Sequence, residues 1–253
     1  MPVKEFTIFR RHRYQAIPDL RLVTLPSTFR GRPVISSEIT ETETAQVATL
    51  CPVGAIQVSP CRIDLGRCVY CNECHFALPE KITFTNDYRL ATNVRESLIV
   101  EAGMDIPVKP DPDKIRKKIR SIFRHALKLR QVSAGGDNSA EMELNAAGNV
   151  NFDMGRYGIE FVASPRHADG IVITGPITSN MAEALQICYD AVPEPKLIIL
   201  AGTDAISGGI FAGSPELNRE FIAKHPADLF VPGNPPHPLT FIHGVMEMIG
   251  RKF

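Results

Sequence analysis

Four of the six cysteines in this chain of 253 residues lie close together. They are Cys51, Cys68, Cys71 and Cys74, and the last three have the spacing C-x2-C-x2-C. This spacing lets three thiolates converge from one tight loop on three irons of a [4Fe–4S] cube, with Cys51 as the donor to the fourth iron. The proline after Cys51 turns the chain away, and a nearby glycine allows a tight turn. The cysteines therefore predict an iron–sulfur site.

A second cluster is not expected. The run is similar to that of bacterial ferredoxins, C-x2-C-x2-C-x3-C-P, in which further cysteines serve a second cluster. Counted from Cys51 and Cys74, the corresponding positions here hold Glu41, Thr44, Val47 and Leu78. The sequence thus predicts one [4Fe–4S] cluster. A structural zinc site is the alternative, because Zn²⁺ also takes four cysteines.

The two remaining thiols and a neighbouring histidine have structural interpretations, and for Cys61 and His75 a functional one stands beside it. Cys61 is either a substitute ligand or a small packed residue, and Cys188 is expected to be a buried, inert thiol on a helix. His75 adjoins Cys74, so it either tunes the cluster through a hydrogen bond or is an ordinary loop histidine.

The composition limits the classes of partner. Lys and Arg number 28, as do Asp and Glu, so no net charge favours a nucleic acid. No apolar run approaches the roughly 18 residues of a membrane span. Residues 1–15 are interrupted by charge and lack the apolar core and cleavage site of a signal peptide. We expect a cytoplasmic protein that meets a membrane only peripherally.

The first half of the chain must position the cysteines. It holds short strand-like pieces at 55–58 and 81–85, followed by a proline-rich linker at 101–113. Apolar residues at helical spacing then predict a helix over 113–130, with Asp111 or Asp113 as its cap. Eight Lys or Arg residues cover its other face. This basic face is either simply solvated or rests on a membrane surface or an acidic partner.

The second half has an α/β pattern. Apolar, β-branched segments at 158–163, 170–175 and 196–202 predict buried parallel strands. The segment 179–192 between them has helical periodicity, with Ser179 or Asn180 as its cap, and 239–250 predicts a closing helix. A strand, a helix and a strand in this order favour a βαβ unit and a parallel sheet.

Longer motifs carry a family resemblance. The stretches LPSTFRGRPVIS, CPVGAI and LGRCVYCNEC resemble the ferredoxin-like subunit of energy-converting hydrogenases, formate hydrogenlyase and respiratory complex I. The stretches YGIEFVASPRHADGIVITGPIT, NMAEAL, PEPKLIILAGTDAISGGIF and VPGNPPHP resemble the small, terminal-cluster subunit (20 kDa type) of the same complexes. The resemblance implies that two subunits are fused in this chain.

The resemblance also implies a lost cluster. The four cysteines that hold the terminal [4Fe–4S] cluster in this family align with Asp137, Ala140, Asp204 and Asn234. These residues cannot replace four soft thiolates. Their oxygens suit Mg²⁺, Ca²⁺ or a proton relay, or else they fill the space as hydrogen-bonded polar residues. The resemblance places Arg166 and His167 close to this site, in a functional or an ion-pairing role.

Together these observations predict an α+β, ferredoxin-like domain (1–100), a linker with the basic helix (101–132), and an α/β, flavodoxin-like domain with a parallel sheet (133–253). The resemblance implies an electron-transfer subunit, peripheral on the inner face of the cell membrane. Its expected partners are a hydrogenase-like or complex I-like large subunit and ion-translocating or antiporter-like membrane subunits. The alternatives are a structural or coupling subunit, or a redox sensor. No motif indicates catalysis by the chain alone.

Overall fold

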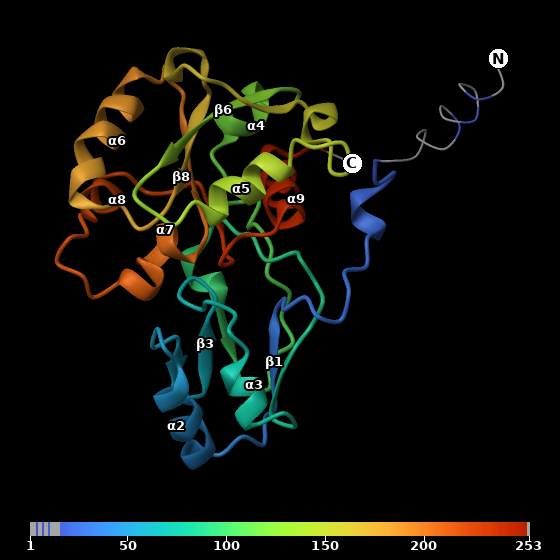
Figure 1. Ribbon diagram of the computed structural model, residues 1–253, viewed down its shortest axis with the longest axis vertical. Helices are drawn as coiled ribbons and strands as arrows, with labels where there is room; N and C mark the ends of the chain where they lie inside the picture. The colour runs from blue at the N-terminus through green and yellow to red at the C-terminus, as the bar shows by residue number, and fades with distance from the viewer. Residues whose placement is uncertain (1–3, 5–6, 8–9, 11–15, 252–253) are drawn as a thin grey trace.

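A parallel sheet of five strands organises the second half of the computed structural model, which describes residues 4, 7, 10 and 16–251 (Figure 1). The strand order is β7-β6-β8-β9-β10, and every neighbouring pair is parallel. Counted along the chain this is the flavodoxin-like order 2-1-3-4-5. The predicted α/β fold is confirmed. The strands are β6 (Leu127–Ser133), β7 (Ile159–Phe161), β8 (Gly170–Thr174), β9 (Leu197–Ala201) and β10 (Leu229–Val231).

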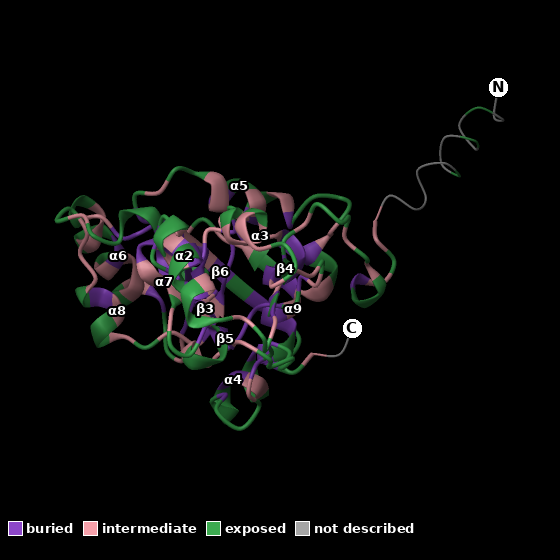
Figure 2. Ribbon diagram, turned by 90° about the horizontal axis from the view of Figure 1, so that it is seen from below, coloured by how far each residue is buried: buried purple, intermediate pink, exposed green. Residues whose placement is uncertain are grey.

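Helices cover both faces of this sheet, which explains why β8 and β9 are buried along their whole length. Side chains alternate between the faces: Ile171 and Ile173 pack toward α6 and α8, and Val172 packs toward α4, α5 and α9. The buried residues gather between these helices in Figure 2. The helices are α4 (Lys117–Ile122), α5 (Ser139–Ala146), α6 (Ser179–Ala191), α8 (Glu220–Lys224) and α9 (Pro238–Ile249).

The first half contains two small antiparallel sheets. One pairs β1 (Pro33–Ile35) with β4 (Ile82–Phe84). The other has the order β2 (Ile56–Gln57), β3 (Arg62–Asp64) and β5 (Ile99–Glu101). Helices α2 (Glu41–Leu50) and α3 (Glu73–Ala77) flank them (Figure 1). The remaining helices are α7 (Thr203–Ser207) and the 3-10 turns η1 (Leu20–Leu22), η2 (Arg95–Leu98), η3 (Met154–Tyr157), η4 (Pro165–His167) and η5 (Gly209–Phe211).

The two halves share one apolar core. Val47 and Ile63 of the first half belong to the same buried cluster as Ile173 of the sheet. In addition, Thr92 exchanges backbone hydrogen bonds with Phe230 of β10, at 3.0 and 2.8 Å, and so covers that edge of the sheet. The halves are thus packed together, and the boundaries at 100 and 132 stay a prediction.

The prediction of a helix over 113–130 is wrong. The helix α4 is limited to Lys117–Ile122 with Arg116 as its cap, and β6 begins at Leu127. Ile115, Ile119 and Phe123 are buried at helical spacing, but the apolar residues from 127 onward alternate with exposed ones. The change of period from helix to strand was hidden because both patterns place apolar residues at similar intervals. The helices predicted at 179–192 and 239–250 are confirmed as α6 and α9.

Two expectations concern membranes and export. Among the described residues, no helix is long and apolar enough to cross a membrane. The sequence also predicts that residues 1–15 are not a signal peptide. Almost all of these residues lie outside the described part of the chain, so the prediction is not tested.

Two of the four positions that lack a second set of cysteines belong to the packed interior of the first half. Thr44 and Val47, both on α2, are 1% and 0% exposed. Thr44 also shares a hydrogen bond with the buried thiol of Cys61. Two of the four positions thus contribute to the core, whereas Glu41 is exposed and Leu78 half-buried.

Shortening Val47 tests this packing. Val47→Ala removes methyl groups from a fully buried site, and we expect a loss of about 2 kcal/mol from the free energy of unfolding, measured by chemical denaturation. The exposed Thr49→Ala on the same helix is the control and should change it by less than about 0.5 kcal/mol. Equal effects of the two substitutions would contradict a packed core at this position.

Candidate functional site

The structure brings the four clustered cysteines together. Cys51, Cys68, Cys71 and Cys74 line one small pocket, whose other walls are mainly apolar. These walls come from the turn after α2, from β2, β3 and β4, and from the cysteine loop: Val53, Ala55, Ile56, Ile63, Val69 and Phe84. In the described part of the chain, no three His, Cys, Asp or Glu side chains are arranged to hold a single metal ion. In a cubane, by contrast, each thiolate binds its own iron, so the sulfurs need not surround one point.

Helix α2 positions the first thiol. Thr40 and Glu43 form a reciprocal capping box at its start, and Cys51 is its C-terminal cap. The backbone N–H of Ala55 donates to the Sγ of Cys51 over 3.2 Å. Such a donor stabilises negative charge on sulfur.

The loop from Cys68 to Cys74 carries the other three thiols. Tyr70 and Asn72 both have left-handed backbone conformations, with φ of 54° and 75°, which curl the loop tightly. The Tyr70 backbone N–H donates to the Sγ of Cys68 over 3.3 Å. Asp64 and Arg95 brace the preceding turn through two hydrogen bonds of 2.8 and 2.7 Å. The loop shape is therefore fixed by the chain itself.

Burial controls the charge of two of these thiols. Burial, with a contribution from the neighbouring cysteines, raises the pKa of Cys68 to about 12 and that of Cys74 to about 11. The apolar pocket thus favours the neutral form of these two thiols. Ligation of a metal would have to release these protons, because only thiolates bind.

The other sulfur and imidazole groups lie apart from this pocket. Cys61 is buried and does not line it, and Cys188 lies half-buried on α6. The Nδ1 of His75 is 2.7 Å from the carbonyl oxygen of Ile82, so this ring is held by β4. These positions favour the structural interpretation of all three residues.

The residues expected at the lost terminal-cluster site also lie close together. Asp137, Ala140, Asp204 and Asn234 line a common pocket at the carboxyl edge of the parallel sheet. Their loops follow β6, β9 and β10, where α/β folds place ligands. A side chain at Gly202 would lie 3.8 Å from the Cβ of Ala140 and 3.6 Å from the carbonyl oxygen of Gly233, so these loops approach closely.

Asp137 and Asp204, two of the three carboxylates that line this pocket, differ in electrostatics. Asp137 accepts hydrogen bonds from the backbone N–H and the hydroxyl of Ser139, at 2.9 and 2.6 Å, which lower its pKa. Burial, followed by the charges of Asp137 and Glu141, raises the pKa of Asp204 to about 6. The buried Oδ1 of Asp204 has no hydrogen-bond partner within the described residues. Asp204 therefore binds a proton more readily than Asp137 does.

One buried hydrogen bond joins the two pockets. The hydroxyl of Thr203, next to Asp204, lies 2.9 Å from the carbonyl oxygen of Cys68 and 3.2 Å from that of Gly233. Thr203 is fully buried. Its hydroxyl therefore fixes the cysteine loop against the loops that follow β9 and β10.

Sequence reasoning missed the residues that support these sites. Glu141 is 9% exposed and accepts a 2.6 Å hydrogen bond from the hydroxyl of Thr174. Thr203 and Tyr70 likewise act through contacts with distant segments. A buried glutamate or a bridging hydroxyl leaves no local pattern, so only the distant partner identifies it.

Arg166 and His167 are both exposed on η4. Within the described part of the chain, neither forms an ion pair. The expected ion pair is therefore not observed, and neither residue lines the two pockets.

Comparisons with known proteins address the second half of the chain. Residues 138–248 match the family described as NADH ubiquinone oxidoreductase, 20 Kd subunit. A probable membrane-bound hydrogenase subunit, mbhJ of Pyrococcus furiosus, is 38% identical over 115 residues, which are 46% of this chain and 69% of that protein. The chain belongs to this family.

Two further proteins are similar to parts of this chain. An NADH-quinone oxidoreductase subunit of Clostridium beijerinckii is 41% identical over 108 residues, 42% of this chain and 64% of that protein. A solved structure of the membrane-bound sulfane sulfur reductase, an archaeal respiratory membrane complex, contains a chain that is 26% identical to this one. The match has a TM-score of 0.45 and covers 52% of this chain and 75% of the reductase chain. The chain thus spans about two thirds of the length of its curated relatives.

The region matched to the 20 Kd subunit family extends from α5 to α9. It includes Ala140, Asp204 and Asn234, and begins directly after Asp137. The cysteine pocket lies outside it, in the first half of the chain.

The raised pKa of Asp204 makes stability depend on pH. The folded pKa of about 6 exceeds the ordinary value of 3.8, so the unfavourable charge is absent below about pH 4 and present above about pH 6. A shift of two units corresponds to about 3 kcal/mol, which partial exposure reduces. Asp204→Asn should therefore stabilise the protein by about 1–2 kcal/mol at pH 8 in denaturant unfolding, with little effect at pH 4.

The exposed Asp113→Asn is the control and should leave stability unchanged at both pH values. An equal effect of Asp204→Asn at pH 4 and pH 8 would contradict a charge-dependent strain at this site.

Proposed function

We propose that this chain is an iron–sulfur subunit of a hydrogenase-related, complex I-like, membrane-associated assembly. In this proposal one [4Fe–4S] cluster, held by Cys51, Cys68, Cys71 and Cys74, serves electron transfer. The observation that carries the proposal is the shared pocket of these four thiols, which also have ferredoxin-type spacing. The membership of the second half in the 20 Kd subunit family supports the assembly.

The residues of the pocket fit such a cluster. Four soft sulfur donors suit iron, and two backbone N–H groups, those of Ala55 and Tyr70, point at sulfur atoms that would carry negative charge. Apolar walls such as Ile63 and Phe84 would exclude water. A bound [4Fe–4S] cluster supplies one-electron transfer.

Within this proposal residues 1–100 form a ferredoxin-like domain fused to the 20 Kd-type subunit. The small antiparallel sheets around the cysteine pocket and the two short helices beside them support this interpretation. The segment 101–132 then connects the ferredoxin-like domain to the α/β domain at 133–253.

The terminal-cluster site of the family is proposed to be lost. Asp137, Ala140, Asp204 and Asn234 line its expected position and offer no thiolate. A divalent cation or a transferable proton at these oxygens is a further part of the proposal, and the unpartnered Oδ1 of Asp204 supports it.

A structural, coupling or redox-sensing role is the second candidate. The observation that favours it is the buried hydrogen bond from Thr203 to the carbonyl of Cys68, which links the cysteine loop rigidly to the Asp204 loop. In such a role the cluster would stabilise the first half and report its redox state through this contact, without passing electrons onward.

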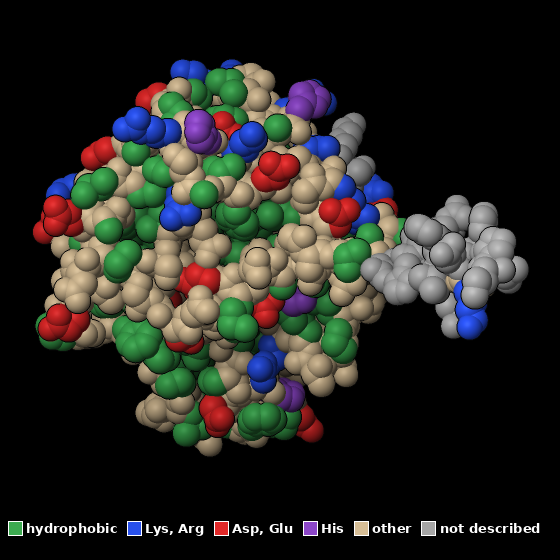
Figure 3. All heavy atoms as spheres, turned by 45° about the horizontal axis from the view of Figure 1, so that its top comes forward, with side chains coloured by type: hydrophobic (Ala, Val, Ile, Leu, Met, Phe, Trp, Pro, Cys, Tyr) green, Lys and Arg blue, Asp and Glu red, His purple; other side chains and the backbone are tan. Residues whose placement is uncertain are grey.

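The proposed partners follow from the relatives. They are a large subunit of the hydrogenase or complex I type and membrane subunits of the ion-translocating or antiporter type, with the chain on the inner face of the cell membrane. A basic surface on and beside α4 supports membrane-side docking. Its exposed residues Lys117, Lys118 and Arg124 form no ion pair within the described residues. Figure 3 shows Lys and Arg side chains on the end of the molecule that carries α4 and β6.

The cluster is tested by its iron. The anaerobically purified, dithionite-reduced protein should contain about four irons and four sulfides per chain and give the EPR signal of a reduced cubane. Cys71→Ser removes an exposed ligand and should abolish the signal, whereas Cys61→Ser and Cys188→Ser should retain it.

About eight irons would contradict the single cluster, and one zinc without iron would replace it with a structural site. Metal analysis of the Cys51→Ser protein tests the second pocket. Stoichiometric Mg²⁺ or Ca²⁺ is expected if the Asp137, Asp204 and Asn234 oxygens hold a cation, and its absence would leave them as polar fillers.

The basic surface is tested by charge reversal. The double substitution Lys117→Glu and Lys118→Glu should release the chain from isolated membranes, because it reverses the charge that meets the membrane assembly. Flotation or sedimentation of membranes measures this. Arg166→Glu with Lys224→Glu changes the net charge equally on other surfaces, and should remain bound. Equal release of both variants would contradict a role for this surface.

A further inference from the structure

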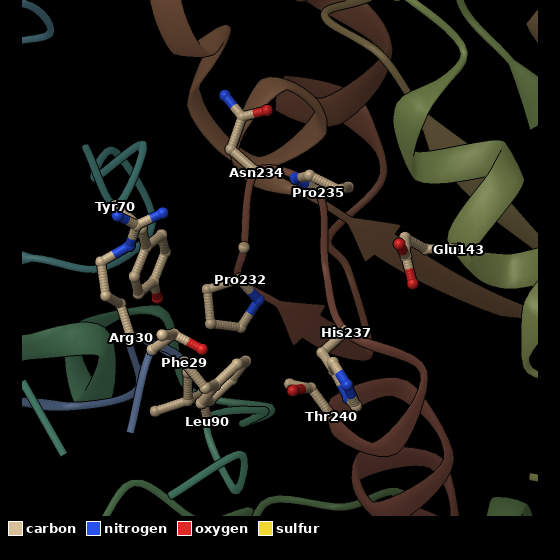
Figure 4. A pocket seen from close by; sticks show the side chains of 12 residues that line it. Phe29, Arg30, Tyr70, Leu90, Glu143, Pro232, Asn234, Pro235, His237 and Thr240 are labelled. Carbon is tan, nitrogen blue, oxygen red and sulfur yellow. The ribbon is translucent and has the colours of Figure 1, made fainter. Parts of the chain in front are cut away.

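A cavity of about 230 Å³ lies between the cysteine loop and the loop that follows β10. Its walls come from segments far apart in the sequence: the 28–30 stretch before β1, Tyr70, Leu90, α5 and the start of α9. Figure 4 shows Tyr70 and Arg30 on one wall and Glu143 on the opposite wall, with Pro232, His237 and Thr240 between them. We call this space the inter-loop cavity.

Two hydroxyl groups of the inter-loop cavity are buried and unpaired. The side chain of Tyr70 belongs to a residue 7% exposed, and that of Thr240 to one 1% exposed. Neither hydroxyl has a hydrogen-bond partner within the described residues. Buried hydroxyls nearly always have partners, and leaving them unpaired costs free energy. Both side chains line the cavity, but the hydroxyl oxygens themselves are fully buried, so a ligand there pairs with them once they turn toward it.

The other polar groups make the inter-loop cavity rich in donors. The Nδ1 of His237 accepts from the backbone N–H of Leu239 over 3.1 Å, so Nε2 carries the proton of the neutral ring. The ring is neutral because burial lowers its pKa to about 4. Arg30 adds a guanidinium, and the 12-residue helix α9 begins here with its positive end. Donors of this kind select an oxygen-bearing anion.

The rest of the lining is apolar. Phe29, Leu90, Pro232 and Pro235 contribute the hydrophobic walls, and the ring of Phe29 meets that of His237 edge to face at 5.3 Å between centroids. Among the described residues, Glu143 is the one acidic residue of the lining. It lies across the cavity from Tyr70 and Arg30, so an anionic group is best placed at the Tyr70–Arg30 wall (Figure 4). A small molecule with an apolar body and one anionic end fits this distribution.

We propose that the inter-loop cavity is a binding site for a small organic carboxylate, whose oxygens accept hydrogen bonds from the Tyr70 and Thr240 hydroxyls and whose apolar body packs on Phe29 and Leu90. No cysteine lines the site. It lies between the cysteine loop and Asn234, so an occupant contacts both.

Benzoate is the probe, and benzylamine is its shape-matched cation. Calorimetric titration of the anaerobically purified full chain should give saturable binding of one benzoate, with a dissociation constant of about 1 mM or less. Benzylamine should bind at least about tenfold more weakly, because it offers no acceptor to the donor-rich wall. Crystals soaked with benzoate should show it in the inter-loop cavity.

Two near-isosteric variants and one control test the hydroxyls. Tyr70→Phe and Thr240→Val each remove an unpaired hydroxyl with little change of volume, and each should weaken benzoate binding about tenfold or more. Both should fold at least as stably as the parent chain, since an unsatisfied buried group is lost. Tyr189→Phe, on α6 and away from the inter-loop cavity, should bind benzoate normally.

Three results would overturn the proposal. They are no saturable benzoate binding up to about ten times the expected dissociation constant, equal binding of benzylamine, and unchanged affinity in whichever of Tyr70→Phe and Thr240→Val keeps the parent thermal midpoint. If the inter-loop cavity holds only ordered water, no saturable benzoate binding will be measured.

Discussion

The hydrogen bond from the Thr203 hydroxyl to the carbonyl of Cys68 connects the two parts of this molecule that carry chemistry. Thr203 follows a fully buried strand, so its position is set by the parallel sheet. Cys68 lies in a loop whose shape is set by left-handed residues and by the Asp64–Arg95 ion pair. A buried hydroxyl is stabilised by a hydrogen-bond partner, and this pairing fixes the distance between the cysteine pocket and the Asp204 loop. The shared apolar core then holds both halves in that arrangement.

The two sites at which the sequence resemblances imply cysteines and this chain has none differ in their packing and polarity. In the first half, Thr44 and Val47 belong to an ordinary packed core. At the edge of the sheet, Asp137, Asp204 and Asn234 keep a polar pocket in which one carboxylate oxygen has no partner among the described residues. Apolar filling stabilises a fold, whereas an unpaired buried oxygen weakens it. The difference separates a filled core in the first half from a polar pocket whose groups are not all paired.

Local pattern was sufficient to predict the strands at 158–163, 170–175 and 196–202 and the helix α6, because buried parallel strands and an amphipathic helix have distinct periods. It failed over 113–130, where a six-residue helix passes directly into β6 and the two periods merge. Cysteine spacing was sufficient to bring the four thiols to one pocket. Thr203, Glu141 and Tyr70 could not be predicted, since each acts through a partner more than thirty residues away or through a cavity between loops.

In our proposal one iron–sulfur cluster occupies the cysteine pocket and none occupies the pocket of Asp137, Asp204 and Asn234. Anomalous diffraction at the iron absorption edge, from crystals grown without oxygen, tests both parts at once. We expect iron density bounded by the sulfur atoms of Cys51, Cys68, Cys71 and Cys74, and no iron at the edge of the sheet. Zinc in place of iron at the cysteines, or an iron cluster beside Asp204, would overturn the proposal.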